Sequence, residues 1–259
     1  MQSLRDQIVL ITGASSGIGA ACARVLAKDG AKLILNGRRK ERLEAIARDL
    51  KEHHGTSSLL RPFDVRDLTQ VKAALEKFPG EWESIDVLIN NAGLARGFDK
   101  LYEGHIEDWE EMIDSNIKGL LYATRLVVPG MVKRGRGHVV NIASIAGMQT
   151  YPRGNVYCAS KAAVRVLSDG LRQDLLGTPI RVTTISPGLV ETEFSQVRFR
   201  GDRERAAQTY RGMTPLTADD VADAVFYSLT RPPHVNINEI VLLPTDQASS
   251  TLVYRREES

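Results

Sequence analysis

The sequence is poor in the features that mark secreted, membrane-spanning and nucleic-acid-binding proteins. Its 259 residues include only 2 cysteines, too few for the disulfide framework of a secreted protein. The formal net charge of +2 gives no electrostatic reason to expect a nucleic acid or an anionic membrane as a partner. No apolar run has the length needed to cross a bilayer, and the short, mixed N-terminal segment lacks the pattern of a secretory signal. We therefore expect a cytoplasmic protein.

Metal, thiol and hydrolase chemistry find no support in the sequence. The histidines lack a second histidine or cysteine at metal-ligand spacing, apart from the adjacent His53 and His54, so we expect no metal and place the histidines at the surface. Cys22 falls within an expected helix and is interpreted as a core residue. Cys158 has no neighbouring base or CxxC motif that would make it reactive. Ser144 lacks a G-x-S-x-G context, which argues against a hydrolase.

A regular alternation of strands and helices fills the chain. Short apolar runs, typical of strands buried on both faces, alternate with longer segments of helical spacing. This pattern predicts a doubly wound α/β fold, with a seven-stranded parallel sheet between two layers of helices. We expect one domain over residues 1–245 and a polar C-terminal tail over 246–259. The expected strands are 7–12, 32–36, 59–63, 85–90, 138–143, 180–185 and 239–243, and the expected helices are 17–28, 39–52, 68–78, 106–132, 156–175 and 218–229.

The turn between the first strand and the first helix is rich in glycine. It runs Thr12-Gly13-Ala14-Ser15-Ser16-Gly17-Ile18-Gly19. Glycine lets a backbone turn sharply and approach a ligand, and the N-terminus of the next helix offers free N–H groups to a pyrophosphate. The spacing G-x-x-x-G-x-G differs from the commoner G-x-G-x-x-G fingerprint. Glycines after a strand often serve only a tight turn, but this position favours nucleotide binding.

The residues after the second strand predict the choice of cofactor. A site for NAD in this architecture usually carries an acidic residue there, which binds the ribose 2′-hydroxyl. Here the chain reads Asn36-Gly37-Arg38-Arg39-Lys40, with no carboxylate. A guanidinium suits a 2′-phosphate by charge and by bidentate geometry. The alternative is that both arginines merely begin a solvated helix; the missing carboxylate favours NADP.

Tyr157 and Lys161 are four residues apart in an expected helix, so their side chains share one face. A free tyrosine has a pKa near ~10, and a neighbouring lysine cation favours the phenolate and lowers that pKa. Tyr157 is therefore a candidate general acid/base. None of the other six tyrosines has a lysine four residues later. The alternative is an ordinary solvated helix face.

These motifs, together with Asn90-Asn91-Ala92-Gly93, Ser144 and Pro187-Gly188, resemble the short-chain dehydrogenase/reductase family in the same order over nearly the whole chain. The resemblance implies a Rossmann-like fold without a separate substrate domain. It also implies hydride transfer between a nicotinamide and an alcohol or carbonyl. By the resemblance, Ser144 donates a hydrogen bond to the substrate oxygen. Lys161 lowers the pKa of Tyr157 and bonds the nicotinamide ribose, and Asn116 holds a water that relays protons from Lys161.

The resemblance extends to the residues that bind the cofactor. Asp64 and Val65 match the pair that contacts the adenine, and the glycine-rich turn matches the pyrophosphate site. A homotetramer, or otherwise a homodimer, is expected on the resemblance alone. The full expected cofactor-binding set is Gly13, Ser15, Ser16, Gly17, Ile18, Gly19, Arg38, Arg39, Asp64, Val65, Asn91, Ala92, Gly93, Tyr157, Lys161, Pro187, Gly188, Val190 and Thr192.

Four tracts narrow the resemblance to the NADP-dependent 3-hydroxy acid dehydrogenases: residues 116–122, 154–157, 188–195 and 233–238. Members of that subgroup oxidise serine, allo-threonine and related 3-hydroxy acids, or reduce the matching 3-oxo acids. Two alternatives stay open. One is a reductase of a bulkier ketone or of an aldehyde, such as a steroid or a secondary-metabolite intermediate. The other is a nucleotide-binding regulator without turnover.

A 3-hydroxy acid needs a cationic partner for its carboxylate, and a planar guanidinium suits it best. Arg198 and Arg200 follow the strip over the nicotinamide, where the family places a mobile substrate-covering loop, and Arg153 lies just before Tyr157. We favour Arg198, because its Val-Arg-Phe context resembles the subgroup most. For each of the three, the alternative is an ordinary solvated arginine.

Overall fold

The strands of this protein are short and apolar, and they form one parallel sheet. In the computed structural model, which describes residues 2–256, β1 (Ile8–Ile11) and β4 (Val87–Asn90) are buried along their whole length. The sheet order is β3-β2-β1-β4-β5-β6-β7, and every pair is parallel. The predicted seven-stranded parallel sheet is thus confirmed. The remaining strands are β2 (Lys32–Asn36), β3 (Ser58–Arg61), β5 (Gly137–Ile142), β6 (Ile180–Pro187) and β7 (Glu239–Leu242).

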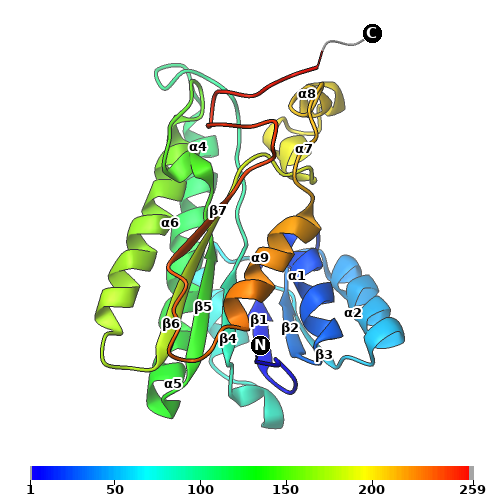
Figure 1. Ribbon diagram of the computed structural model, residues 1–259, viewed down its shortest axis with the longest axis vertical. Coiled ribbons are helices and arrows are strands. Elements are labelled where there is room, and N and C mark those ends of the chain that lie inside the picture. The colour runs from blue at the N-terminus through cyan, green and yellow to red at the C-terminus, as the bar shows by residue number, and fades with distance from the viewer. Residues whose placement is uncertain (1, 257–259) are drawn as a thin grey trace.

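Helices cover both faces of the sheet, because alternate side chains of each strand point to opposite sides. Val9 and Ile11 of β1 belong to one core with α1 (Gly17–Lys28), α2 (Lys40–His54) and α9 (Ala218–Leu229). Ile8 and Leu10 belong to the core on the other face. That face is covered by α3 (Leu68–Leu75), α5 (Gly119–Arg134) and α6 (Asn155–Asp174), with α4 (Ile106–Ile113) packed beside α6 (Figure 1).

The predicted helix over 106–132 departs from a regular α-helix in its middle. A π-helical turn, Asp114–Lys118, lies between α4 and α5. Such a turn inserts one extra residue and is frequent at functional sites. Here it contains Asn116, whose side chain is buried. Apolar spacing averages over the whole helix, so it did not predict this change in winding.

Two short helices that the sequence did not predict lie above the carboxyl ends of the strands. They are α7 (Phe194–Arg198) and α8 (Arg203–Gln208), both too short to show a helical period. An isolated parallel β-bridge between Val190 and Leu216 joins the two ends of the segment that contains α7 and α8. The C-terminal segment crosses the same end of the molecule (Figure 1). Its Arg256 N–H donates to the Gly212 carbonyl at 2.7 Å.

The burial of His138 contradicts its predicted place at the surface, and the burial of Cys22 confirms its predicted place in the core. His138, expected at the surface, is buried, because β5 is a central strand that is covered on both faces. Its Nε2 lies 2.8 Å from Thr183 Oγ1. Cys22 is a core residue as predicted, and burial raises the pKa of its thiol to about 12.

Within residues 2–256, no helix has the length and apolarity needed to cross a membrane.

Candidate active site

A cleft opens at the carboxyl ends of the strands, where the strand order reverses between β1 and β4. Parallel α/β sheets bind ligands at such a switch point. The cleft has a volume of about 840 Å³, and its lining extends from the glycine-rich turn to the C-terminal segment. The structure brings most of the predicted site residues to this wall: Gly13, Ser15, Ser16, Gly17, Ile18, Arg38, Arg39, Asp64, Val65, Asn91, Ala92, Gly93, Ser144, Tyr157, Lys161, Pro187, Gly188, Val190 and Thr192.

Asn91 and two glycines with positive φ shape the glycine-rich turn. Gly13 has φ +68° and Gly17 has φ +52°, in the left-handed region that glycine adopts without strain. The Asn91 amide donates to the carbonyls of Thr12 at 2.9 Å and of Gly13 at 3.1 Å. Ser16 precedes α1 but makes no side-chain cap, so the first N–H groups of this helix remain free for an anion.

Gly19, predicted to bind cofactor, does not line the cleft. A Cβ at Gly19 would lie 2.4 Å from the Gly13 oxygen and 2.5 Å from Asn91 Nδ2. The glycine is therefore required for close packing of α1 against the turn. Its effect on a ligand is indirect, through the shape of the backbone that lines the cleft.

Arg38 and Arg39 both line the cleft beside the glycine-rich turn. Arg39 donates from Nη2 to Ser16 Oγ at 2.9 Å and pairs through Nη1 with Glu193 at 3.0 Å. Arg38 lies 3.9 Å from the Asp64 carboxylate. Arg39 therefore contacts the glycine-rich turn, and Arg38 lies beside Asp64 on the same wall of the cleft.

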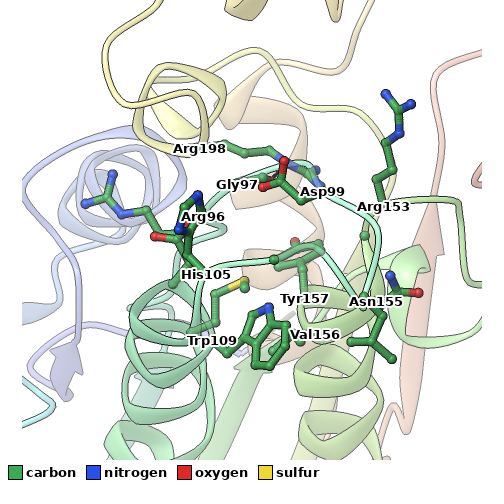
Figure 2. A pocket seen from close by; sticks show the side chains of 15 residues that line it. Arg96, Gly97, Asp99, His105, Trp109, Arg153, Asn155, Val156, Tyr157 and Arg198 are labelled. Atoms are coloured by element: carbon green, nitrogen blue, oxygen red, sulfur yellow. Dashed lines mark hydrogen bonds between the residues drawn. The ribbon is translucent and has the colours of Figure 1, made fainter.

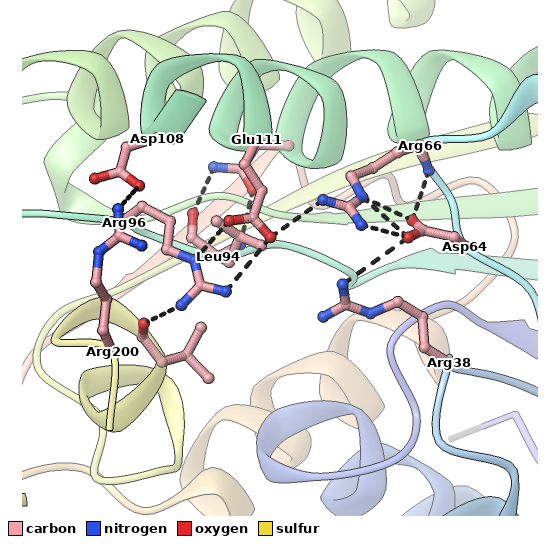
Figure 3. Close-up of polar contacts among 10 residues, drawn as sticks. Arg38, Asp64, Arg66, Leu94, Arg96, Asp108, Glu111 and Arg200 are labelled. Atoms are coloured by element: carbon pink, nitrogen blue, oxygen red, sulfur yellow. Dashed lines mark hydrogen bonds and ion pairs between the residues drawn. The ribbon is translucent and has the colours of Figure 1, made fainter. Parts of the chain in front are cut away.

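A chain of charges connects the expected adenine end of the cleft to α7 (Figure 3). Arg66 pairs with Asp64 at 2.6 Å and with Glu111 at 3.1 Å. Arg96 pairs with Glu111 at 2.6 Å and donates to the Val197 carbonyl at 2.6 Å. Burial acts to raise the pKa of Asp64, but the hydrogen bonds from Arg66 hold it below its usual value. Asp64 is therefore a stable anion at neutral pH.

Tyr157 and Lys161 are buried on one side of α6, with exposed fractions of 9% and 5%. Lys161 Nζ lies 6.0 Å from the Tyr157 ring centroid and donates to the Ile142 carbonyl at 2.8 Å. Burial raises the pKa of Tyr157, and a hydrogen bond with Ser144 opposes that rise. The net lowering of this pKa expected from the sequence is thus not found, because desolvation outweighs the charge effects at a phenol whose ring lies 5.4 Å from that of Phe194. Burial lowers the pKa of Lys161 itself to about 8.

Asn116 does not line the cleft but supports the helix that carries Tyr157. Its Oδ1 accepts from the Leu94 N–H at 2.8 Å, and its Nδ2 donates to the Leu94 carbonyl and to Ser160 Oγ, both at 2.9 Å. Ser160 Oγ donates in turn to the Tyr157 carbonyl at 2.7 Å. Both amide hydrogens of Asn116 are thus committed to protein groups.

The three candidate substrate arginines have different surroundings. The Arg198 guanidinium lies among aromatic rings, 4.8 Å from the centroid of Phe98, 5.3 Å from Tyr151 and 5.9 Å from Tyr157. Figure 2 shows Arg198 reaching across the small recess above Tyr157, whereas the Arg153 side chain extends away from it.

Arg200 is not part of this wall. It pairs with the buried Asp108 at 2.5 Å and lines neither the cleft nor the recess. Of the three candidates, Arg198 alone combines a partly buried guanidinium, contact with the Tyr157 ring and no carboxylate partner in residues 2–256.

Sequence reasoning missed several residues of the cleft wall. Phe98, Tyr151 and Phe194 supply its aromatic surface, and Glu193 lies opposite Arg39. Gln247, in the segment expected to be a polar tail, accepts from the Leu189 N–H at 2.8 Å and lines the cleft. These residues carry no local motif, because only the folded chain brings them to one wall. Among residues 2–256 there is no cluster of potential metal ligands.

Known proteins share this fold and these motifs over nearly the whole chain. The short chain dehydrogenase model matches residues 7–203. The NADP-dependent 3-hydroxy acid dehydrogenase of Salmonella typhi is 49% identical over 250 residues, 96% of this chain and 99% of that protein. Sulfoacetaldehyde reductase 2 of Chromohalobacter salexigens is 44% identical, over 97% of this chain and all of that protein.

A solved structure agrees with these sequence matches. The closed form of a serine dehydrogenase complexed with NADP+ superimposes with a TM-score of 0.90 at 47% identity, covering 97% of this chain and 100% of the other. The sequence and the overall fold are thus both shared with a dehydrogenase over nearly the whole chain. This chain belongs to the short-chain dehydrogenase family.

Proposed function

We propose that this protein is an NADP-dependent oxidoreductase that transfers hydride between the nicotinamide and a 3-hydroxy acid, such as serine or allo-threonine. One observation carries the proposal: a partly buried guanidinium, Arg198, lies beside Tyr157 at the end of the cleft away from Arg38 and Arg39. A dinucleotide can therefore lie along the cleft, with an anionic substrate at its far end. The similarity to a dehydrogenase and a reductase, both of anionic substrates by their names, supports this reading.

The described residues fit NADP in charge and in shape. The uncapped N-terminus of α1 suits the pyrophosphate, and Arg38 and Arg39 suit the 2′-phosphate. None of residues 37–40, directly after β2, is acidic, whereas a site for NAD would have a carboxylate there to accept a hydrogen bond from the 2′-hydroxyl. Asp64 and Val65 lie at the same end of the cleft, where the adenine is expected.

The cofactor supplies hydride acceptance and donation at its nicotinamide; the chain supplies orientation and proton transfer. Tyr157 exchanges the proton of the substrate hydroxyl, and Ser144 donates a hydrogen bond to the substrate oxygen as negative charge develops there. Because burial favours the neutral phenol, Tyr157 starts as a proton donor in the reductive direction. In the oxidative direction, the positive charge of Lys161 favours the phenolate that must form.

Arg198 is proposed to bind the substrate carboxylate. It donates from Nη1 to the Tyr151 hydroxyl at 2.8 Å and from Nε to the Gly97 carbonyl at 3.3 Å, which fix the guanidinium in place. Aromatic faces exclude water around it, so a charged ligand would be held more strongly than at an exposed arginine. Tyr151 acts as the positioning residue for this cation.

A second candidate is the reduction of an aldehyde that carries a sulfonate. A guanidinium binds oxyanions of either kind, and one relative of 44% identity is named for sulfoacetaldehyde. In both candidates Arg198 binds the anionic group of the substrate, which is a carboxylate in the first and a sulfonate in the second.

The direct test is nicotinamide absorbance with a panel of substrates. Purified protein is mixed with NADP or NAD and with serine, allo-threonine, 3-hydroxypropionate and a neutral secondary alcohol, and the reverse reaction is followed with sulfoacetaldehyde and NADPH. We expect the highest kcat/KM for a 3-hydroxy acid with NADP. Preference for neutral alcohols, or for NAD, would contradict the proposal.

We further propose a cytoplasmic homotetramer, an assembly supported only by the resemblance to the family. Sedimentation equilibrium measures its mass directly. A mass of about 28.6 kDa, that of one chain, would contradict the assembly.

A further inference from the structure

Two carboxylates of α4, Asp108 and Glu111, point to the same side of the helix, because residues three apart are neighbours on a helix surface (Figure 3). Asp108 is buried and Glu111 is partly buried. Each carboxylate pairs with an arginine of another segment, Asp108 with Arg200 at 2.5 Å and Glu111 with Arg96 at 2.6 Å. Both arginines belong to or contact the segment that carries Arg198, so α4 contacts this segment at two points.

Glu111 holds Arg96 where it joins α4 to the residue before Arg198. Arg96 donates to the Glu111 carboxylate through Nε and to the Val197 carbonyl through Nη1, both at 2.6 Å. Arg66 pairs with the same carboxylate at 3.1 Å. Burial acts to raise the pKa of the Glu111 carboxyl, but the hydrogen bond from Arg96 holds it below its usual value. Glu111 is therefore a fixed anion at neutral pH, and its loss would leave Arg96 without the partner that orients it.

Asp108 holds the same segment on the other side of Arg198. Its partner Arg200 has φ +54°, a left-handed conformation that residues other than glycine rarely adopt. Gly97 has φ +67° and lies against Asp108, because a Cβ at Gly97 would be 3.0 Å from Asp108 Oδ2. The Gly97 N–H donates to the Arg198 carbonyl at 3.2 Å, and the Gly97 carbonyl accepts from Arg198 Nε at 3.3 Å. The backbone is thus held before, at and after Arg198.

We propose that Asp108 and Glu111 are positioning residues, which hold Arg198 in the place where it binds the anionic group of the substrate. The inference rests on the proposed function, because it requires that Arg198 binds this anion. Neither carboxylate lines the cleft, and Asp108 reaches only the small recess above Tyr157. Their effect on the substrate therefore passes through the segment that carries Arg198.

The sign of the effect separates positioning from the field of the carboxylates. A carboxylate repels a nearby anion, so neutralising it should tighten an anionic substrate if its charge alone mattered. Positioning predicts the opposite result. Without Glu111 or Asp108, Arg198 loses its fixed geometry, and the anionic substrate should bind more weakly.

The test compares an anionic with a neutral substrate in each variant. Glu111→Gln should raise KM for 3-hydroxypropionate by about threefold to tenfold, within the range of coupling in one hydrogen-bond network, and leave KM for a neutral secondary alcohol within about twofold. Asp108→Asn should act in the same direction. The matched control is Glu110→Gln, which removes an equal charge from an exposed residue of α4 that makes no ion pair in residues 2–256.

Two results would overturn the proposal. A KM for 3-hydroxypropionate that stays constant or falls in Glu111→Gln would leave no positioning effect. An equal rise for the neutral alcohol would mean that the carboxylates support the whole site rather than Arg198.

A double-mutant cycle tests whether the effect passes through Arg198. In the Arg198→Met background, Glu111→Gln should raise KM for 3-hydroxypropionate no further, because the guanidinium that it positions is gone. Arg96→Lys keeps the charge but loses the planar guanidinium that joins Glu111 to the Val197 carbonyl, so alone it should reproduce Glu111→Gln. Additive losses in the cycle, or an unchanged KM in Arg96→Lys, would refute this route.

The same cycle separates this proposal from the proposed function. If Arg198→Met leaves KM for 3-hydroxypropionate unchanged, the anion does not bind to Arg198, and both proposals fail. If Arg198→Met raises this KM but Glu111→Gln and Glu110→Gln behave alike, the anion site stands and the positioning role of α4 is refuted.

Discussion

The Arg198 guanidinium donates to the Tyr151 hydroxyl at 2.8 Å, and no carboxylate pairs with Arg198 in residues 2–256. Arg200, two residues later, has the opposite arrangement, because it is paired with the buried Asp108. Two neighbouring arginines of one segment thus differ in what they can bind. Arg200 is neutralised by the protein, whereas Arg198 is available to an external anion next to Tyr157.

The first prediction tests this difference through the Michaelis constant. Arg198→Met should raise KM for a 3-hydroxy acid by about tenfold or more, the scale of a charged hydrogen bond, and barely change KM for a neutral secondary alcohol. Arg203→Met, at an exposed arginine of α8, is the matched control and should change neither. Equal losses on both substrates would mean that Arg198 does not bind the carboxylate.

A second prediction concerns the 2′-phosphate. Replacing both Arg38 and Arg39 with Ala should weaken NADP binding by about tenfold to a hundredfold, because charge-assisted bonds to the phosphate are lost, and leave NAD nearly unchanged. Lys40→Ala removes a cation next to them that does not line the cleft, and it should have little effect. Dissociation constants of NADPH and NADH, measured by the fluorescence of the reduced nicotinamide, decide this. A parallel loss for both cofactors would show that the arginines support the fold instead.

The third prediction follows from the lowered pKa of Lys161. Burial lowers this pKa to about 8, below the ordinary lysine value of 10.5, so the ammonium destabilises the folded state at neutral pH. Between pH 8 and 10.5 the unfolded chain binds the extra proton, and stability rises with pH. Relative to Lys161→Met, the free energy of unfolding of the unmodified protein should rise by on the order of 3 kcal/mol across that window.

Urea unfolding of the cofactor-free protein measures that difference at pH 7.5 and pH 10. Groups that titrate alike in both proteins cancel, which isolates Lys161. A difference in unfolding free energy that stays constant with pH would place the pKa of Lys161 at its ordinary value.

The order of strands and helices could be predicted because each buried strand is a continuous apolar run bounded by turn residues. The strand Lys32–Asn36 agrees with its predicted bounds for this reason, and the helix Gly17–Lys28 agrees because its apolar residues recur at helical spacing. The winding of Asp114–Lys118 could not be predicted, since one inserted residue leaves the apolar spacing on either side intact. Phe194–Arg198 is too short to show a period.

The site was predicted where function requires a residue type at a fixed local spacing, as at Tyr157 and Lys161. It was missed where a residue acts through a partner distant in sequence, as Glu193 does with Arg39 and Gln247 with Leu189. The raised pKa of Tyr157 was missed for a related reason. Spacing indicates which charges are near, but desolvation depends on the enclosing structure.

The most direct test of the account is NADP reduction by 3-hydroxypropionate in the unmodified protein and in Tyr157→Phe, with NADP affinity measured alongside. The substitution removes one hydroxyl from a buried ring, so folding and cofactor affinity should persist. Turnover should fall by about two orders of magnitude or more, the scale of general acid/base catalysis. Near-normal turnover in Tyr157→Phe, or no NADP reduction by the unmodified protein, would contradict the account.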